Sequence, residues 1–357
     1  MASKRSKRRL AKSRIKKKVL VLSVHDYAGS GHRYSEAVNR VGKYKSTSLK
    51  FLYHSFGYDS DYCIARDYNE KIDKKLFRTR LVEAQKLVDE ADILHFKGDY
   101  PVSGRWGLFK GKHLRGGYPT LSIPLEKPIV LTASGSKFRR HLVGGGNLSL
   151  NLFPMETMVK HTNARTVTTP DLNYPEFDSE WLPFALDTKA TKNIWLERSH
   201  DIIKIGHTPS NRRRKGTDSI LVPAIKLVKE KGFNVELEIV EKKSYKEILE
   251  IKKGFSMFWD QCSFGFYGNS LVEAAQYGVP CMTWLSETSL KQSGPLGDFP
   301  IVTFDRNPES CADEIIKIIT GDIETLSKRT KAWADRVHSY ESVGAQLTSI
   351  YNRVLRG

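Results

Sequence analysis

A basic turn, IGHTPSNRRRKGTD (205–218), contains the residues of this chain that are best suited to bind an anion. Four consecutive cations, Arg212 to Lys215, follow a short apolar run and precede the pattern of an amphipathic helix that starts near Thr217. The N–H groups at the start of a helix and the charge-assisted hydrogen bonds of Arg and Lys both favour phosphate. On these residues alone, a phosphate site and a solvated basic turn are both open.

A second segment, DQCSFGFYGNSLVEAAQYGVPCMTWL (260–285), has the order strand end, glycine loop, helix, strand. Gly265 and Gly268 permit close approach of the backbone to a ligand, and the polar residues that follow can cap the helix. Glu273 falls on the first turn of that helix, where its carboxylate could accept both hydroxyls of a ribose. The alternative is an acid that only stabilises the helix dipole.

Alternating strand and helix patterns place both segments after predicted strands. In the first half, strand patterns occupy residues 18–24 and lie near residues 50, 93, 130 and 166. In the second half, predicted strands at 201–207, 233–240, 254–260, 279–285 and 299–304 alternate with helices that begin near Thr217, Ser244, Asn269 and Pro308. Residues 322–356 are predicted to be helical throughout. This alternation predicts a mostly parallel sheet that is covered on both faces.

The expected fold is α/β, with two Rossmann-like domains facing a cleft (GT-B) and a C-terminal helix that crosses back to the first domain. The predicted boundaries are a basic disordered tail over 1–17, an N-terminal domain over 18–182, a C-terminal domain over 183–340 and the final helix over 341–357. Ligands of such sheets lie beyond the carboxyl ends of the strands, where the basic turn and the glycine loop both occur.

Composition limits the class of protein. The 357 residues are 39% hydrophobic, which is enough for two cores, and the net charge is +18. Met1 to Lys18 alone contains ten Lys or Arg and no acid. The four cysteines form no C-x-x-C pair, and no run of about 20 apolar residues is present. We therefore expect no transmembrane segment and a cytoplasmic protein, peripheral at the inner membrane face, or located in the host cytoplasm if viral.

Together, the two segments resemble the donor-binding half of GT-B glycosyltransferases of family four, which are retaining enzymes. VLTASGSKFRR (130–140) is similar to the HGSD-x-R segment of that family, and VTTPDLNYPEFDSEWLPFALD (167–187) is similar to its strand-and-linker region. The resemblance runs from about residue 18 to about residue 350. It implies a hexosyltransferase with acceptor-side and donor domains in that order. The co-substrate would be a UDP- or GDP-linked sugar, with no cofactor and no metal.

The resemblance also implies roles for individual residues. Arg212 and Lys215 would hold the donor diphosphate and stabilise the leaving group, and Glu273 matches the second acid of the E-x7-E motif, which binds the ribose. Gly29 and Gly31 match the glycine turn that faces the donor across the cleft. The predicted donor-binding residues are therefore Gly29, Gly31, Asn211, Gly216, Gly268, Asn269, Ser270 and Glu273.

Two departures from the family pattern concern the sugar and the acceptor. The first acid of E-x7-E is replaced by Gly265, so the contact to the transferred sugar is missing or comes from Asp260 or Gln261. The histidine that commonly precedes GSD is replaced by Ser134. The weaker acceptor-side candidates are His25, Asp26, His95, Ser134 and Gly135. The D-x-D sequence at Asp59–Asp61 copies a metal-binding motif of the other glycosyltransferase fold, and we expect no metal there.

The basic segment, residues 4–18, suits a polyanion. An anionic membrane surface with an envelope-saccharide or lipid acceptor is ranked first, and nucleic acid with a hydroxymethylated base, as in virus-encoded DNA glucosylation, is ranked second. The predicted function is sugar transfer to an acceptor hydroxyl with retention. A third hypothesis, suggested by Gly265 and Ser134, is a non-catalytic basic binding protein on a degenerate GT-B fold.

Overall fold

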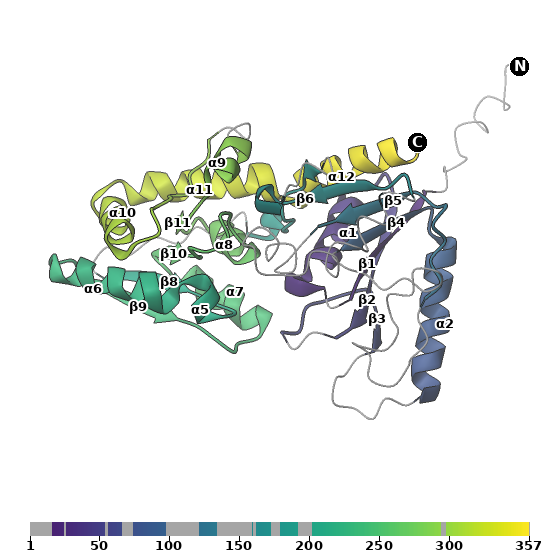
Figure 1. The fold of residues 1–357 in the computed structure, drawn as a ribbon, viewed down its shortest axis with the longest axis horizontal. Coiled ribbons are helices and arrows are strands. Elements are labelled where there is room, and N and C mark those ends of the chain that lie inside the picture. Colours follow the sequence, from purple (N-terminus) through teal and green to yellow (C-terminus); the bar gives the residue numbers. More distant parts are fainter. Residues whose placement is uncertain are drawn as a thin grey trace, which may run out of the picture.

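Two parallel β-sheets, one in each half of the chain, organise the molecule (Figure 1). The computed structural model describes residues 16–24, 26–53, 56–65, 74–97, 121–133, 159, 162–172, 179–191, 202–293 and 298–356. Within these ranges every pairing between named strands is parallel. The predicted α/β class with parallel sheets is therefore confirmed.

The first sheet has the strand order β3-β2-β1-β4-β5-β6-β7. Its strands are β1 (Lys18–Ser23), β2 (Lys45–Leu52), β3 (Tyr62–Ala65), β4 (Ile93–Lys97), β5 (Ile129–Thr132), β6 (Arg165–Thr168) and β7 (Glu180–Trp181). Helices α1 (Ser30–Val41) and α2 (Lys74–Glu90) follow β1 and β3. The sequence pattern identified five of these strands and missed β3 and β7, which are both short.

The second sheet has the order β11-β10-β8-β9, with β8 (Ile203–His207), β9 (Val235–Ile239), β10 (Met257–Trp259) and β11 (Cys281–Met282). The strand predicted at 299–304 is wrong, because this segment makes only an isolated bridge between Val302 and Met282. The α-helices of this half are α5 (Arg212–Lys215), α6 (Val222–Glu230), α7 (Tyr245–Lys253), α8 (Asn269–Ala275), α9 (Glu287–Ser293), α10 (Pro308–Thr320), α11 (Ile323–His338) and α12 (Tyr340–Val354). A π-helical turn, Thr217–Leu221, leads into α6 at the position where a helix was predicted to begin.

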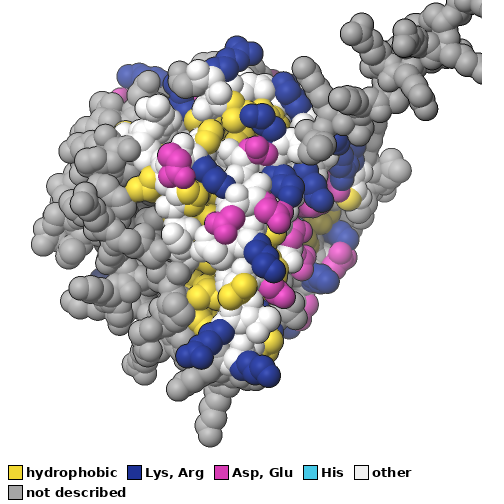
Figure 2. Space-filling view, turned by 90° about the vertical axis from the view of Figure 1, so that its right-hand side faces the viewer, with side chains coloured by type: hydrophobic (Ala, Val, Ile, Leu, Met, Phe, Trp, Pro, Cys, Tyr) yellow, Lys and Arg dark blue, Asp and Glu magenta, His cyan; other side chains and the backbone are white. Residues whose placement is uncertain are grey.

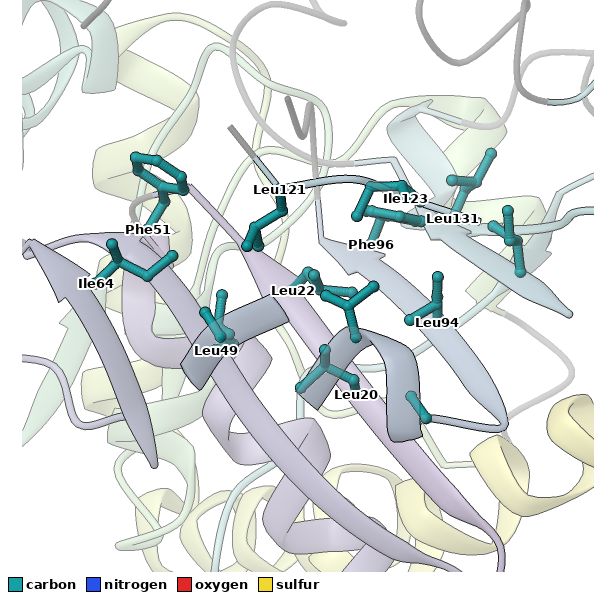
Figure 3. Packing of buried hydrophobic residues seen from close by; sticks show 14 of the residues in the cluster. Leu20, Leu22, Leu49, Phe51, Ile64, Leu94, Phe96, Leu121, Ile123 and Leu131 are labelled. Atoms are coloured by element: carbon teal, nitrogen blue, oxygen red, sulfur yellow. The ribbon is translucent and has the colours of Figure 1, made fainter. Parts of the chain in front are cut away.

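Side chains of β1 alternate between two cores of the first domain. Leu20 and Leu22 pack with β2, β4 and α2 on one face, as Figure 3 shows for the strand residues. Val19 and Val21 pack on the opposite face with residues of α1 and α12. Because successive side chains of a strand point to opposite faces, an uninterrupted apolar run is what a strand buried on both sides requires.

Helix α12 crosses back from the second half to the first domain, as predicted (Figure 1). The region predicted to be helical throughout, 322–356, consists of α11 and α12, which are separated by Ser339, an extended residue with ψ of 151°. Ser339 also forms an isolated bridge to Leu186, which follows β7, the last strand of the first sheet. At Gly344, α12 packs so closely against α1 that a Cβ atom would lie 2.1 Å from the carbonyl oxygen of Ala37.

Charge on the outer face of the first domain is mixed in sign. Figure 2 shows Lys and Arg side chains interspersed with Asp and Glu among the described atoms of this face. Lys18, the last residue of the predicted polyanion-binding segment, belongs to β1 and donates from Nζ to Glu90 at 2.6 Å. Residues 1–15, which carry the rest of that segment, lie outside the described residues. In the described ranges we find no helix with the length and apolar character needed to cross a bilayer.

Candidate functional site

The basic run forms a one-turn helix, α5, directly after β8. The Asn211 side chain caps it by accepting a hydrogen bond from the backbone N–H of Arg214 at 2.9 Å. Gly216 ends it in the left-handed conformation, with φ of 84°. A Cβ atom on Gly216 would lie 2.1 Å from Sγ of Cys262, so no larger residue fits there. Asn211 and Gly216 thus shape the turn that presents the cations.

Asp260 connects the basic turn to the glycine loop. Its buried carboxylate accepts from Lys215 Nζ at 2.8 Å through Oδ1, and from the backbone N–H of Gly268 at 2.7 Å through Oδ2. Oγ1 of Thr208 and Oγ of Ser270 are 2.7 Å apart, which gives a second contact between the same loops. The structure therefore brings together the two segments that the sequence singled out.

Arg212 lies apart from this pair. Its guanidinium forms a forked contact with Asp218, with Nε 3.1 Å from Oδ2, and Nη1 lies 3.8 Å from Glu241. The hydrogen bond from Arg212 holds the pKa of Asp218 below its ordinary value. Lys215 and Arg212 are consequently held by different acids, although they lie in one turn of helix.

The side chain of Gln261 fixes the conformation of the glycine loop. The Gln261 amide accepts from the backbone N–H of Phe264 at 2.7 Å and donates to the carbonyl of Phe266, so both of its ends are used inside the loop. This geometry does not favour the predicted sugar contact by Gln261. At Gly265, φ is +71°, and a Cβ atom would lie 3.0 Å from Cβ of Ser286. The absent acid of the E-x7-E motif thus coincides with a backbone conformation that side chains rarely adopt.

Glu273 is buried between two cations. Its Oε1 accepts from Nη2 of Arg33 at 3.0 Å, and its Oε2 accepts from Nζ of Lys252 at 2.7 Å. Lys252 is fully buried and also donates to the carbonyl and the hydroxyl of Ser270. Burial alone would raise the pKa of Glu273, but Lys252 and Arg33 hold it below its ordinary value. Glu273 is therefore an ionised, paired carboxylate. It is the fifth residue of α8, so the prediction that it lies on the first turn is wrong.

Arg33 and Lys252 were not among the predicted site residues. Lys252 carried a usable signal, because it follows Ile248 by four residues on a helix whose isoleucines pack against the core, so the pattern places it on the inner face. A lysine there needs a buried acid as partner. Arg33 carried no such signal, since its partner is 240 residues away in the chain.

In the glycine turn of the first domain, the backbone N–H groups bind a carboxylate of the same chain, that of Asp26. The carboxylate of Asp26 accepts from the backbone N–H groups of Gly31 at 2.7 Å and His32 at 3.0 Å. A Cβ atom on Gly31 would lie 2.9 Å from Oδ1 of Asp26, and Gly29 has φ of +60°. The start of α1 is thus capped by Asp26, and the geometry does not favour a donor contact by Gly29 or Gly31.

His95 was predicted to end a strand on the cleft side, and this position is wrong. It lies in the middle of β4, fully buried, with Nδ1 2.8 Å from the Tyr351 hydroxyl and Nε2 2.6 Å from Thr132 Oγ1. Burial lowers the pKa of His95 to about 3. It is a neutral core residue that links β4 and β5 to α12. The other acceptor-side candidates His25, Ser134 and Gly135 lie outside the described residues.

Asp61, the last residue of the D-x-D sequence, is held by β2. Its Oδ2 accepts from the backbone N–H of Ser48 at 2.7 Å and from the Ser48 hydroxyl at 2.9 Å. Among the described residues, His32, Glu36 and Asp61 form one group whose possible ligand atoms lie within 4.8 Å of one another. Their hydrogen bonds to Ser48 explain the arrangement of His32 and Asp61 without an ion.

Comparison with solved structures identifies the fold. The sucrose-phosphate synthase of Thermosynechococcus elongatus matches with a TM-score of 0.58 at 12% identity, over 96% of this chain and 100% of that one. HepE of Anabaena, in complex with UDP and glucose, matches with a TM-score of 0.61 at 10% identity, over 94% and 100%. WaaG, a glycosyltransferase involved in lipopolysaccharide biosynthesis, matches with a TM-score of 0.55 at 10% identity, over 93% and 99%.

These likenesses cover nearly the whole chain, and they show that it has the GT-B fold of two Rossmann-like domains. No protein-family model matches the sequence, and no curated protein matches it.

Proposed function

We propose that this protein is a GT-B glycosyltransferase, a retaining hexosyltransferase that takes its sugar from a nucleotide-diphosphate donor. The observation that carries the proposal is the link from Lys215 through Asp260 to Gly268, which fixes an ammonium group beside the glycine loop. The fold supports it, because HepE has been solved with UDP and glucose and with UDP-glucose. UDP is therefore the favoured nucleotide, the donor domain being residues 183–340 and the acceptor-side domain residues 18–182.

Lys215 is the group that we assign to the leaving nucleotide. An ammonium has three N–H donors, and Asp260 uses one of them. The side chain of Lys215 is 13% exposed, so most of its charge faces protein rather than water. A cation fixed in such a setting stabilises the negative charge that grows on the diphosphate as the sugar departs, without reorganising at that moment.

Arg212 would supply a second cation to the diphosphate after exchanging its present acidic partners for phosphate oxygens. Its present contacts to Asp218 and Glu241 are surface ion pairs, which contribute little stability and exchange readily. A guanidinium can bind phosphate oxygens in a fork, as it now binds Asp218. With two cations supplied by side chains, the proposed mechanism needs no metal and no cofactor.

The acceptor that we favour is an envelope saccharide or lipid, reached by a cytoplasmic enzyme at the inner membrane face. WaaG, which has the same fold, is involved in lipopolysaccharide biosynthesis. A hydroxymethylated base in nucleic acid is the second candidate, supported by the ten cations of Met1 to Lys18. A non-catalytic binding protein is the third candidate, supported by Gly265 and Ser134 in place of the family's acid and histidine.

A screen with nucleoside diphosphates tests the first step of the proposal. A nucleotide present at 100 times its dissociation constant should raise the unfolding free energy by about 2.7 kcal/mol, which thermal unfolding detects. Mass spectrometry of products from UDP- and GDP-sugars, with saccharide, lipid and hydroxymethylated DNA acceptors, then identifies the reaction. No stabilisation by any nucleotide would refute the proposal and favour the binding protein.

A further inference from the structure

One cluster of side chains joins the two domains beside the proposed nucleotide site. Arg33 of α1 contacts Glu273 of α8, and both side chains are only 7% exposed. The Arg33 guanidinium also lies over the ring of Tyr245, the first residue of α7, at 4.9 Å. Tyr245 in turn packs against Tyr58 of the first domain, with ring centroids 5.3 Å apart, and its N–H donates to the carbonyl of Phe56 at 3.2 Å.

The contact by Arg33 occupies the carboxylate that a ribose would need. Oε2 of Glu273 is bound to Lys252, which comes from the same domain and is fully buried. Oε1 is bound to Arg33, which comes from the other domain. A ribose diol donates to carboxylate oxygens, so it competes with the guanidinium for the same atom. Only the Arg33 contact can be released by separating the domains.

The Arg33 guanidinium also does not make all the hydrogen bonds that it could make. Nη1 of Arg33 is buried and has no hydrogen-bond partner in the part of the chain that the structure describes. Within the same ranges Oδ1 of Asn269, the first residue of α8, is likewise buried and without a partner. Unpaired buried polar groups oppose burial, so the closed arrangement is poised to open when a ligand offers better contacts.

We propose that Arg33 is a gate at the proposed nucleotide site. Without nucleotide it blocks the site by holding Glu273, and a nucleoside diphosphate must displace it to place its ribose on Glu273. This inference rests on the proposed function. The apparent dissociation constant equals the intrinsic value divided by the fraction of open molecules. If nine molecules in ten are closed, removing the gate tightens binding about tenfold.

The test compares UDP binding by wild type, Arg33→Met and Arg33→Lys in isothermal titration. Methionine keeps an apolar side chain of similar length in the buried position, but cannot hold Glu273. We expect Arg33→Met to bind UDP about tenfold more tightly than wild type, and Arg33→Lys to show a smaller gain. The matched control is Arg329→Met, because Arg329 pairs with Asp298 of its own domain, with Nε 2.9 Å from Oδ2. Its UDP affinity should equal that of wild type.

Unchanged or weaker UDP binding by folded Arg33→Met would overturn the gate. If Arg33→Met does not fold, Arg33→Lys provides the same test. The proposal is then overturned if Arg33→Lys binds UDP no more tightly than wild type does. A second readout needs no nucleotide: the distance between spin labels at V82C on α2 and V222C on α6, both exposed sites. The four native cysteines are buried, so they should not compete for the label.

We expect the distance distribution of the Arg33 variant to shift relative to that of unliganded wild type, and identical distributions would overturn the gate. If wild type and the Arg33 variant both bind no nucleoside diphosphate, but the variant shows the shift in distance, the proposed function is refuted and the interdomain contact by Arg33 stands. The two failures are therefore distinguishable.

Discussion

Lys215 and Asp260 depend on each other at the scale of single residues. Asp260 is buried, and its two oxygens are bound to Lys215 and to the N–H of Gly268. A buried carboxylate requires such partners, so Asp260 fixes both the ammonium and the entry to α8. The sequence suggested Asp260 as a substitute sugar ligand, but the geometry favours a positioning role.

Replacing Lys215 by Ala should lower turnover more than it raises the donor Michaelis constant. The charge that Lys215 opposes grows as the leaving group departs, and loss of one such group typically costs about 10²- to 10³-fold in turnover. Steady-state kinetics with the donor that the screen identifies measures both constants. Arg214→Ala, an exposed cation in the same turn, is the control and should be near wild type. An effect on the Michaelis constant alone would assign Lys215 to ground-state binding.

Restoring the missing acid by Gly265→Glu should reduce stability and fail to improve activity. The residue has φ of +71°, and its Cβ would lie 3.0 Å from Ser286. A side chain held in that conformation costs on the order of 1–3 kcal/mol, which urea unfolding measures. Gly265→Ala carries the same backbone strain without the carboxylate, so it separates the two effects. A glutamate variant that is as stable as wild type and more active would contradict this account.

At the scale of elements, the sequence predicted which segments are buried better than it predicted which segments pair as strands. Apolar runs located β1 and β8 because strands covered on both faces need them. The run at 299–304 has the same character, yet Val302 makes only a bridge to Met282. An apolar run predicts that a segment is covered, and it does not say whether a neighbouring strand is available. The helices expected near Ser244 and Pro308 begin there, because capping residues or proline mark their starts. The helix expected near Asn269 also begins there, but its N-cap is Gly268 and no side chain caps it, so the predicted capping is wrong.

The contact between α1 and α12 should be the least tolerant of added volume. A Cβ atom at Gly344 would lie 2.1 Å from the Ala37 carbonyl oxygen, so Gly344→Ala must push the helices apart. Overpacking of this kind costs about 1–3 kcal/mol of unfolding free energy. Gly254→Ala is the matched control, because φ is −83° there and the nearest atom lies 3.5 Å from its Cβ. Equal stability of the two variants in urea would contradict the packing argument.

At the scale of the whole molecule, the contact between the basic turn and the glycine loop was predictable from the sequence. The contact between the two domains was not. Strand, turn and helix patterns placed Lys215 and Gly268 at the ends of parallel strands, where the fold brings them together. The pairing of Arg33 with Glu273 spans 240 residues and depends on how the domains meet. Local sequence patterns contain no information about how the two domains contact each other.

Deleting residues 1–15 should leave donor binding unchanged and weaken binding to the polyanionic partner. These residues carry seven Lys or Arg and no acid, whereas the described residues of the proposed donor site begin with Arg33. Lys18 stays, because it belongs to β1 and is paired with Glu90. Titration with UDP at matched ionic strength should give the same affinity for both proteins.

The salt dependence of partner binding then separates the two acceptor classes. With duplex DNA, each lost phosphate contact should flatten the slope of log affinity against log salt by about 0.9, or about 6 for seven contacts. With acidic vesicles, the truncated protein should dissociate, since each basic residue near the surface contributes about 1 kcal/mol. Whichever partner shows the larger loss is the one that the segment recruits. If truncation changes neither, the acceptor must be recognised by the folded domains, where the face shown in Figure 2 carries both signs of charge.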